Sequence, residues 1–314
     1  LPKSVAKSCF GTGVLALVGM LTGVLNVSKR KAARVMNEVF NVPMNLVGLS
    51  NCEQQIADSL AASYDQALKH IREQEVAHAD ETGWKESGRT VWLWVLRTAT
   101  VTLYMIGRRS WDVIADVMEH FAGWLMSDGY AQYRHYGQRL RCLAHIIRKS
   151  RGLAESYDAQ AAAFGEKVLK FLSLFIRGIY AARGDPSLNL PEKFAQELTQ
   201  LRELCEQHRD HPHDKTRGLA RELLNDWDAI WNVLTYPELP ITNNVAERAL
   251  RHWVIARKIS YGTRTQQGSR AYTLLASVID TCRQRGIAPW PYIAQVIAER
   301  RQGNPPPPLP QPIA

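Results

Sequence analysis

The amino-acid sequence predicts an α+β fold, in which a mixed sheet is flanked by helices and preceded by an all-α N-terminal region. Residues 1–75 carry apolar side chains at helical spacing, and residues 76–150 contain short β-branched and aromatic runs. Beyond residue 150 the chain returns to helical periodicity. Its 314 residues are enough for one large domain or two ordinary domains.

The N-terminal region, residues 1–75, is expected to contain only helices. Ser28 can cap a helix over about residues 29–40, and a second helix is expected over about residues 46–75. Two helices around a tight turn, with basic residues nearby, could form a helix-turn-helix DNA-binding unit; a plain packing layer is an equally good interpretation. The apolar stretch Phe10–Leu25 is short for a membrane span and is expected to be a buried helix.

The predicted sheet lies within residues 76–150. Thr90–Thr98 is β-branched and aromatic with both faces apolar, which is typical of a central strand, and Ser87-Gly88 indicates a turn before it. Trp111–Phe121 has apolar residues at helical spacing and is predicted to be a helix. The other predicted strands are Val76–Ala79, Val101–Ile106, Trp124–Met126 and Arg139–Leu143. The order is therefore close to β-β-β-α-β-α-β.

Residues 151–236 are polar and helical, with one helix expected over Arg217–Trp231. A cluster of three histidines and an aspartate within them could bind a metal, although a solvated loop is the preferred interpretation. This cluster consists of His208, His211, His213 and Asp214. The chain ends in a proline-rich tail, residues 301–314, which is expected to be extended and disordered.

The charge of the chain favours a polyanionic partner. Lys and Arg number 39 against 30 Asp and Glu, which gives a net charge of +9 and a pI near 9.4. Nucleic acid is the first candidate, although charge alone is weak support. The five cysteines are widely spread and include no Cys-x-x-Cys pair, so a reducing compartment fits better than a disulfide framework.

The stretch Thr242–Arg251 is predicted to begin a helix. Thr242 and Asn243 can cap free backbone N–H groups. Four polar side chains then share one helical face, namely Asn244, Glu247, Arg248 and Arg251. Taken by itself, this pattern is best interpreted as a solvated helix face with an Arg–Glu pair.

A basic segment follows this helix start. Six cationic side chains stand against the single acid Glu247: Arg248, Arg251, Arg257, Lys258, Arg264 and Arg270. Trp253, Tyr261 and several glycines lie among them. Because DNA phosphates are held mainly by such cations, we expect a DNA-binding surface here, with Asn244 as a further contact.

Three carboxylates stand at suggestive places. Asp80 is expected at the end of the first predicted strand, Asp128 at the end of the fourth, and Glu247 on the capped helix. If the first and fourth strands are parallel and adjacent, the two aspartates emerge at the same sheet edge. Each acid alone is ordinary, but three convergent carboxylates suit Mg²⁺. Glu81 should point to the opposite face of its strand.

Five motifs occur in order along the chain. They are His78-Ala79-Asp80-Glu81-Thr82-Gly83-Trp84, Ser127-Asp128-Gly129-Tyr130, Arg141-Cys142-Leu143-Ala144-His145, Thr242–Arg251 and Arg257–Arg264. Together they resemble the transposases of bacterial insertion sequence 66, over residues 10–300 or so. The resemblance implies a ribonuclease-H-like core with an Asp-Asp-Glu triad, carried here by Asp80, Asp128 and Glu247. It also implies Mg²⁺ as cofactor, bound as two ions, with Mn²⁺ as a substitute.

The resemblance also implies how the chain is divided. Residues 76–150 and 237–300 would form the catalytic core, and the helical residues 151–236 would be an insertion before the last acid. Family members usually carry an upstream coiled coil and a Cys-rich zinc-binding segment, which are not among these 314 residues, so a longer protein is expected. Cys142 and His145 match a family motif, and structural packing is preferred over a zinc site.

The implied function is metal-dependent hydrolysis of phosphodiesters at element ends, followed by strand transfer to target DNA. Expected partners are these DNAs, further copies of the chain and accessory transposition proteins; the expected location is the bacterial cytoplasm, nucleoid-associated when DNA is bound. One rival is a recombinase with a tyrosine nucleophile, Tyr130 or Tyr261. The others are a catalytically inactive DNA-binding remnant and a purely structural helical protein.

Overall fold

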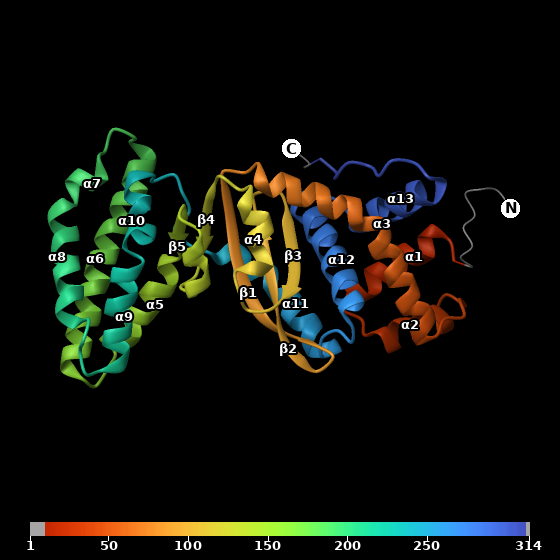
Figure 1. Cartoon of the computed structure of the whole chain (residues 1–314), viewed down its shortest axis with the longest axis horizontal. Coiled ribbons are helices and arrows are strands. Elements are labelled where there is room, and N and C mark those ends of the chain that lie inside the picture. Colours follow the sequence, from red (N-terminus) through yellow and green to blue (C-terminus); the bar gives the residue numbers. More distant parts are fainter. Residues whose placement is uncertain (1–9, 312–314) are drawn as a thin grey trace. The chain divides into compact units, whose positions relative to one another are not determined.

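A computed structural model describes residues 10–311, so Cys9 lies outside the described residues. The chain forms two compact units. The first runs to Gly123 and resumes at Val245, and the second is Trp124–Asn244. The strands pair in the antiparallel sense in the first unit and in the parallel sense in the second. The predicted α+β class is therefore confirmed (Figure 1).

The first unit contains three antiparallel strands in the order β1-β2-β3. They are β1 (Val76–Glu86), β2 (Arg89–Arg97) and β3 (Thr102–Gly107). Ser87 and Gly88 form the β1–β2 turn with φ angles of 51° and 80°, which matches the left-handed turns that suit the twist of a hairpin. The predicted turn is confirmed, but β1 extends seven residues beyond the predicted Val76–Ala79.

The free edge of β3 is covered by helix α12 (Gln266–Gln284). Thr102 N–H donates to Thr281 Oγ1 at 3.1 Å, and Tyr104 N–H donates to Ser277 Oγ at 2.8 Å. Hydroxyl side chains thus take the place of a further strand, which satisfies buried N–H groups and prevents edge pairing. Helix α4 (Asp112–Glu119) follows β3 as predicted.

The N-terminal region is helical as predicted. It comprises α1 (Thr12–Gly19) with a π-helical turn (Met20–Val24), α2 (Lys29–Glu38) and α3 (Leu46–Arg72). Ser28 Oγ caps α2 by accepting from Lys31 N–H at 3.4 Å. Among the helices described, none is long and apolar enough to cross a membrane.

The C-terminal part of the first unit consists of α11 (Asn244–Ser260), α12, α13 (Pro289–Gln302) and the tail. The predicted disorder of the tail is wrong for residues 303–311. Leu309 is buried and its N–H donates to Gln66 Oε1 at 2.8 Å, while Arg285 donates to Pro310 O at 2.7 Å. A side chain of α3 and one directly after α12 thus form hydrogen bonds with the tail backbone, and Figure 1 shows the tail passing over α3.

The second unit contains a parallel strand pair and six helices among its described residues. The strands are β4 (Trp124–Ser127) and β5 (Arg139–Arg141). The helices are α5 (Leu143–Ala154), α6 (Ala159–Gly184), α7 (Leu190–Lys193), α8 (Ala195–His208), α9 (Asp214–Asn225) and α10 (Trp227–Thr235). The predicted helical stretch, residues 151–236, lies within this unit.

Two details of the second unit differ from the sequence prediction. Only a short 3-10 turn, Ala131–His135, separates β4 from β5, where a helix was expected. The predicted helix Arg217–Trp231 is divided into α9 and α10 at Asp226. Asp226 is 2% exposed and pairs with three arginines. Apolar periodicity does not report such ion pairs, because the arginines are distant in the sequence.

Candidate active site and nucleic-acid interface

Asp80 lies in the middle of β1, and its predicted place at a strand end is wrong. Pairing with β2 continues to Glu86, so β1 passes through the acid. Directly opposed residues of antiparallel strands share one face of the sheet. Asp80 opposes Val95 of β2, and Val95 opposes Tyr104 of β3. The Asp80 side chain therefore belongs to the sheet face of Tyr104.

Helix α11 packs on this same face. Tyr104 Oη lies 3.0 Å from Ala249 O of α11. Further along α11, Arg257 Nη1 donates to Thr82 Oγ1 at 3.3 Å. Thr82 lies two residues beyond Asp80 and therefore on the same face of the sheet. Glu247 precedes Ala249 by two residues. The helix that covers the face of Asp80 thus also carries the predicted third acid.

A buried polar anchor fixes α11 against the sheet. Asp280 Oδ2 of α12 accepts from Tyr104 Oη and from Trp253 Nε1, each at 2.7 Å. The Trp253 and Tyr104 rings meet edge to face, with centroids 5.6 Å apart. Burial first, and then the Asp280 charge, raise the pKa of Tyr104, which keeps its hydroxyl a donor. The position of Glu247 in the first unit depends on this anchor.

Glu81 occupies the other face of the sheet, as the sequence predicted. It opposes Trp94, and its carboxylate pairs with Arg109 at 2.9 Å. The Arg109 guanidinium lies over the Trp92 ring, 4.1 Å from the centroid. Asp80 and Glu81 are therefore adjacent carboxylates with opposite orientations, which makes Glu81 a matched control for Asp80.

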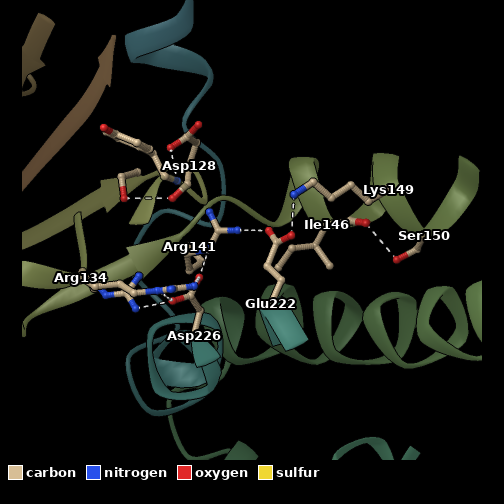
Figure 2. A network of polar contacts seen from close by, with 11 residues as sticks. Asp128, Arg134, Arg141, Ile146, Lys149, Ser150, Glu222 and Asp226 are labelled. Atoms are coloured by element: carbon tan, nitrogen blue, oxygen red, sulfur yellow. Dashed lines mark hydrogen bonds and ion pairs between the residues drawn. The ribbon is translucent and has the colours of Figure 1, made fainter. Parts of the chain in front are cut away.

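Asp128 belongs to the second unit, where it directly follows β4 as predicted. Its Oδ1 accepts from Tyr130 N–H at 2.8 Å, so the carboxylate closes its own turn (Figure 2). Ser127 O accepts from Cys142 N–H at 2.9 Å, at the end of β5. The turn Asp128-Gly129-Tyr130 is thereby held beside the start of α5.

A buried ionic network lies beneath this turn, and sequence analysis missed its acids. Asp226 pairs with Arg134, Arg139 and Arg141 at 2.9, 2.5 and 3.1 Å. Glu222 pairs with Arg141 and with Lys149 (Figure 2). One signal for these acids was present in the sequence, namely Arg-Leu-Arg within a predicted strand. A buried arginine needs an anionic partner, so this pattern indicates that acidic side chains lie nearby. The identity of that partner, more than 80 residues away, could not be derived from spacing.

The network predicts acid sensitivity of the second unit. Burial alone would raise the pKa of Asp226, but hydrogen bonds from Arg134 and Arg139 and the arginine charges lower it overall. A lowered folded-state pKa stabilises the unit above the unfolded-state value of about 3.9, and this stability is lost as pH falls through the folded-state pKa. Between pH 5 and 2, the free energy of unfolding should therefore fall less steeply in Asp226→Asn than in the wild type, by up to about 1.4 kcal/mol per pH unit. Denaturant unfolding monitored by circular dichroism measures this slope. Equal slopes would contradict the prediction.

Cys142 and His145 lie at the start of α5. Cys142 is buried and its Sγ accepts from Asn243 N–H at 3.2 Å. Leu143 N–H donates to Ile241 O at 2.9 Å. These bonds tie the start of α5 to the segment that leads into α11, and the preference for structural packing over a zinc site stays a prediction.

The histidine cluster around Pro212 serves local structure. His213 Nδ1 accepts from Thr216 N–H at 3.3 Å and so caps α9. His211 Nε2 lies 3.0 Å from Gln160 Oε1, and His208 stacks on Phe164. This agrees with the preferred interpretation of the cluster as a loop.

The predicted DNA contacts differ in exposure. Six of the seven are exposed: Asn244, Arg248, Arg251, Lys258, Arg264 and Arg270. Arg257 is half-buried, and its guanidinium donates to Gly83 O of β1. The exposed cations therefore form the accessible part of this surface, while Arg257 ties α11 to the sheet.

The loop between α11 and α12 is braced by the tip of the β1–β2 hairpin. Thr263 N–H donates to Lys85 O at 2.8 Å, and Ser87 N–H donates to Thr263 O at 2.9 Å. Tyr261 and Gly262 both have positive φ, 56° and 91°. This backbone leaves the Tyr261 side chain 75% exposed within the basic segment.

Gly262→Ala is expected to destabilise the first unit by about 2 kcal/mol. A Cβ at Gly262 would lie 2.1 Å from Lys85 O, and the positive φ adds strain. Thermal unfolding measures the effect. Gly303→Ala is the matched control, since its φ is 77° but nothing lies within 4 Å of the added Cβ, and should cost about 1 kcal/mol. Equal shifts in the two variants would contradict the bracing role of the hairpin tip.

Comparison of the sequence with known proteins identifies a family. The sequence model described as "Transposase IS66 family" matches residues 7–271. In Sinorhizobium fredii (strain NBRC 101917 / NGR234), "Uncharacterized protein y4qI" is 27% identical over 276 residues, covering 77% of this chain and 50% of the relative. "Uncharacterized protein y4jO" of the same organism is 27% identical over 169 residues, covering 54% and 50%. The chain thus spans about half the length of these curated relatives.

The family match covers most of the chain, including β1 with Asp80, the turn of Asp128 and α11 with Glu247. It agrees with the order of the sequence motifs and with the exposed cations beyond Glu247. The chain therefore belongs to the IS66 family of transposases.

Proposed function

We propose that this chain is a DNA transposase that hydrolyses phosphodiesters at element ends and joins the freed strands to target DNA. One observation carries the proposal: the Asp80 side chain belongs to the sheet face covered by α11, the helix that bears Glu247. Asp128, directly after β4, would complete the set of three acids. Three antiparallel strands, a helix and a further strand agree with a ribonuclease-H-like core.

Asp80, Asp128 and Glu247 would together hold Mg²⁺, or Mn²⁺ in its place, as two ions. The donor set fits, because all three side chains offer carboxylate oxygens, which are the ligands that Mg²⁺ prefers. When bound, such ions make water a stronger nucleophile and stabilise charge on the leaving oxygen.

The exposed cations of α11 and the following loop would hold the DNA backbone. At the element end, water attacks phosphorus, the bond to the 3′ oxygen breaks, and the strand leaves with a 3′ hydroxyl. That hydroxyl then attacks a target phosphodiester in line, and the target's own 3′ oxygen departs. A P–O bond forms and another breaks in each step, protons pass to solvent, and no bond joins protein to DNA.

The test is a cleavage assay on DNA that carries the two ends flanking this coding sequence. With Mg²⁺ or Mn²⁺ we expect nicks that end in 3′ hydroxyls, and with chelator none. Cleavage that survives chelation and traps a protein–DNA adduct would instead support a tyrosine recombinase, for which the exposed Tyr261 is a candidate. DNA binding without cleavage of either end would favour a catalytically inactive remnant.

Exposed cations predict a strong dependence of DNA affinity on salt. Arg248→Ala combined with Arg251→Ala should reduce the slope of log K against log salt by about 1 per lost phosphate contact. Fluorescence anisotropy with labelled duplex between about 50 and 200 mM salt measures this slope. Arg209→Ala is the control, because Arg209 is an exposed arginine on the second unit, paired with Glu206. An unchanged slope in the double variant would remove α11 from the proposed interface.

Other parts of the proposal concern partners. Helices α2 and α3 would form a helix-turn-helix contact with DNA, and α2 carries Lys29, Arg30 and Arg34. The chain spans about half the length of its curated relatives, so the activity of the whole protein is part of the proposal. The proposed partners, besides DNA, are further copies of the chain on DNA and accessory transposition proteins.

A further inference from the structure

We propose that Glu222 and Asp226, on the helical part of the second unit, are positioning residues that set the Asp128 turn through Arg141. The inference rests on the proposed function, in which Asp128 is a catalytic acid. In this proposal, the helices that precede Glu247 in the sequence hold the carboxylate of Asp128 in place.

Arg141 is the centre of this arrangement. Its side chain is fully buried, and as the last residue of β5 it pairs with Ser127, the residue before Asp128. Its guanidinium donates to Glu222 Oε1 from Nη2, and Nε lies 3.1 Å from Asp226 Oδ2. Both acids come from one place, the end of α9 and its junction with α10. Two anions therefore lie against the guanidinium, Glu222 through a hydrogen bond and Asp226 through an ion pair.

The Asp128 turn rests directly on this ion pair. A Cβ built at Gly129 would lie 2.6 Å from Arg141 Nη2 and 2.9 Å from Glu222 Oε1. Only a backbone without a side chain can approach so closely. Any shift of the guanidinium or of the glutamate therefore changes the space that the turn occupies.

The other end of the turn is held by the same helix junction. Arg134 lies on the 3-10 turn that follows Tyr130, and its guanidinium donates to Asp226 Oδ1 at 2.9 Å. Asp226 thus joins the segment after the Asp128 turn to β5, through Arg134 on one side and Arg139 and Arg141 on the other (Figure 2). Two acids of the helical part therefore hold the chain at residues 134, 139 and 141, and the backbone at Gly129 lies against one of them.

Removal of one acid leaves a buried arginine with less compensation, so the guanidinium must move toward another partner or toward water. Because the turn lies on the guanidinium, the Asp128 carboxylate would then lose its fixed position. A displacement of about 1 Å at a catalytic group can cost about a hundredfold in rate, whereas DNA contacts on the first unit would be unaffected.

Glu222→Gln tests the inference. Hydrogen exchange of the Gly129 and Tyr130 amides should become at least tenfold faster, while α6 amides keep their protection. Cleavage should need several-fold more Mn²⁺ for half-maximal rate at unchanged DNA affinity, and Glu222→Asp should recover part of this loss. Asp210→Asn is the matched control, because it removes an exposed ion pair with Arg221 of α9 and should change neither readout.

Unchanged exchange at the turn in a folded Glu222→Gln protein overturns the positioning role, whatever the activity. If wild-type protein cleaves no end DNA, the proposed function fails, and the exchange data still decide the positioning. Should Glu222→Gln not fold, Gly129→Ala presses on Arg141 from the other side with both acids intact, and it should produce the same shift in Mn²⁺ dependence. Normal Mn²⁺ dependence in that variant would also overturn the inference.

Discussion

Asp80→Asn is expected to reduce metal-dependent strand cleavage by at least about a thousandfold while DNA affinity stays within about twofold. Metal assistance contributes several kcal/mol of transition-state stabilisation, and each 1.36 kcal/mol is a factor of ten. The isosteric amide keeps the shape of the strand but removes the anionic oxygen. Asp128→Asn and Glu247→Gln should behave alike. Single-turnover cleavage rates and anisotropy titrations measure the two effects.

Glu81→Gln is the control for this prediction. The residue is adjacent in sequence, also acidic and equally part of β1, but it pairs with Arg109 on the opposite face. Its rate should stay within a few-fold of the wild type. Full activity of Asp80→Asn, or equal losses in the Asp80 and Glu81 variants, would remove Asp80 from the proposed metal site.

Trp253→Ala is expected to destabilise the first unit by about 3–5 kcal/mol, the range for deletion of a large buried aromatic side chain. Trp253 is 1% exposed, packs against Tyr104 and Tyr272, and donates to Asp280. The variant also leaves the partly buried Asp280 with one hydrogen bond fewer. Native-state hydrogen exchange of α11 and α12 measures this loss for the first unit alone, because the two units need not unfold together.

Trp290→Ala provides the comparison for Trp253→Ala. Trp290 stands in the first turn of α13 and is 40% exposed, so its removal should cost less than about 1 kcal/mol. Trp253→Phe should lie between the two, since it keeps most of the ring packing and loses the N–H donor. A loss below about 1 kcal/mol in Trp253→Ala would mean that the anchor does not hold α11.

Much of the fold follows from local signals in the sequence. The apolar periodicity of α2 and α3, the cap at Ser28 and the turn at Ser87-Gly88 depend on neighbouring residues only, and the structure confirms them. The family was predicted from five short motifs, and the family match confirms it. The opposite orientations of Asp80 and Glu81 follow from strand alternation alone.

Failures of prediction share a different cause. The extra length of β1 depends on a partner strand that continues to pair, and the ordered tail depends on Gln66 and Arg285 from distant helices. The division of α9 from α10 depends on three arginines around Asp226. Each of these features is stabilised by residues far away in the chain, which composition and periodicity do not report.

By itself, the sequence determined most of the element types, the basic character of the segment after Glu247 and the identity of the candidate acids, because propensity, charge and motif order are local properties. Only the tertiary structure decided that α11 covers the sheet face of Asp80, that Arg257 binds β1 and that Glu222 and Asp226 hold Arg141 beneath the Asp128 turn. These are contacts between segments tens to more than a hundred residues apart. Burial and ion pairing select them during folding, and no local pattern in the sequence encodes them.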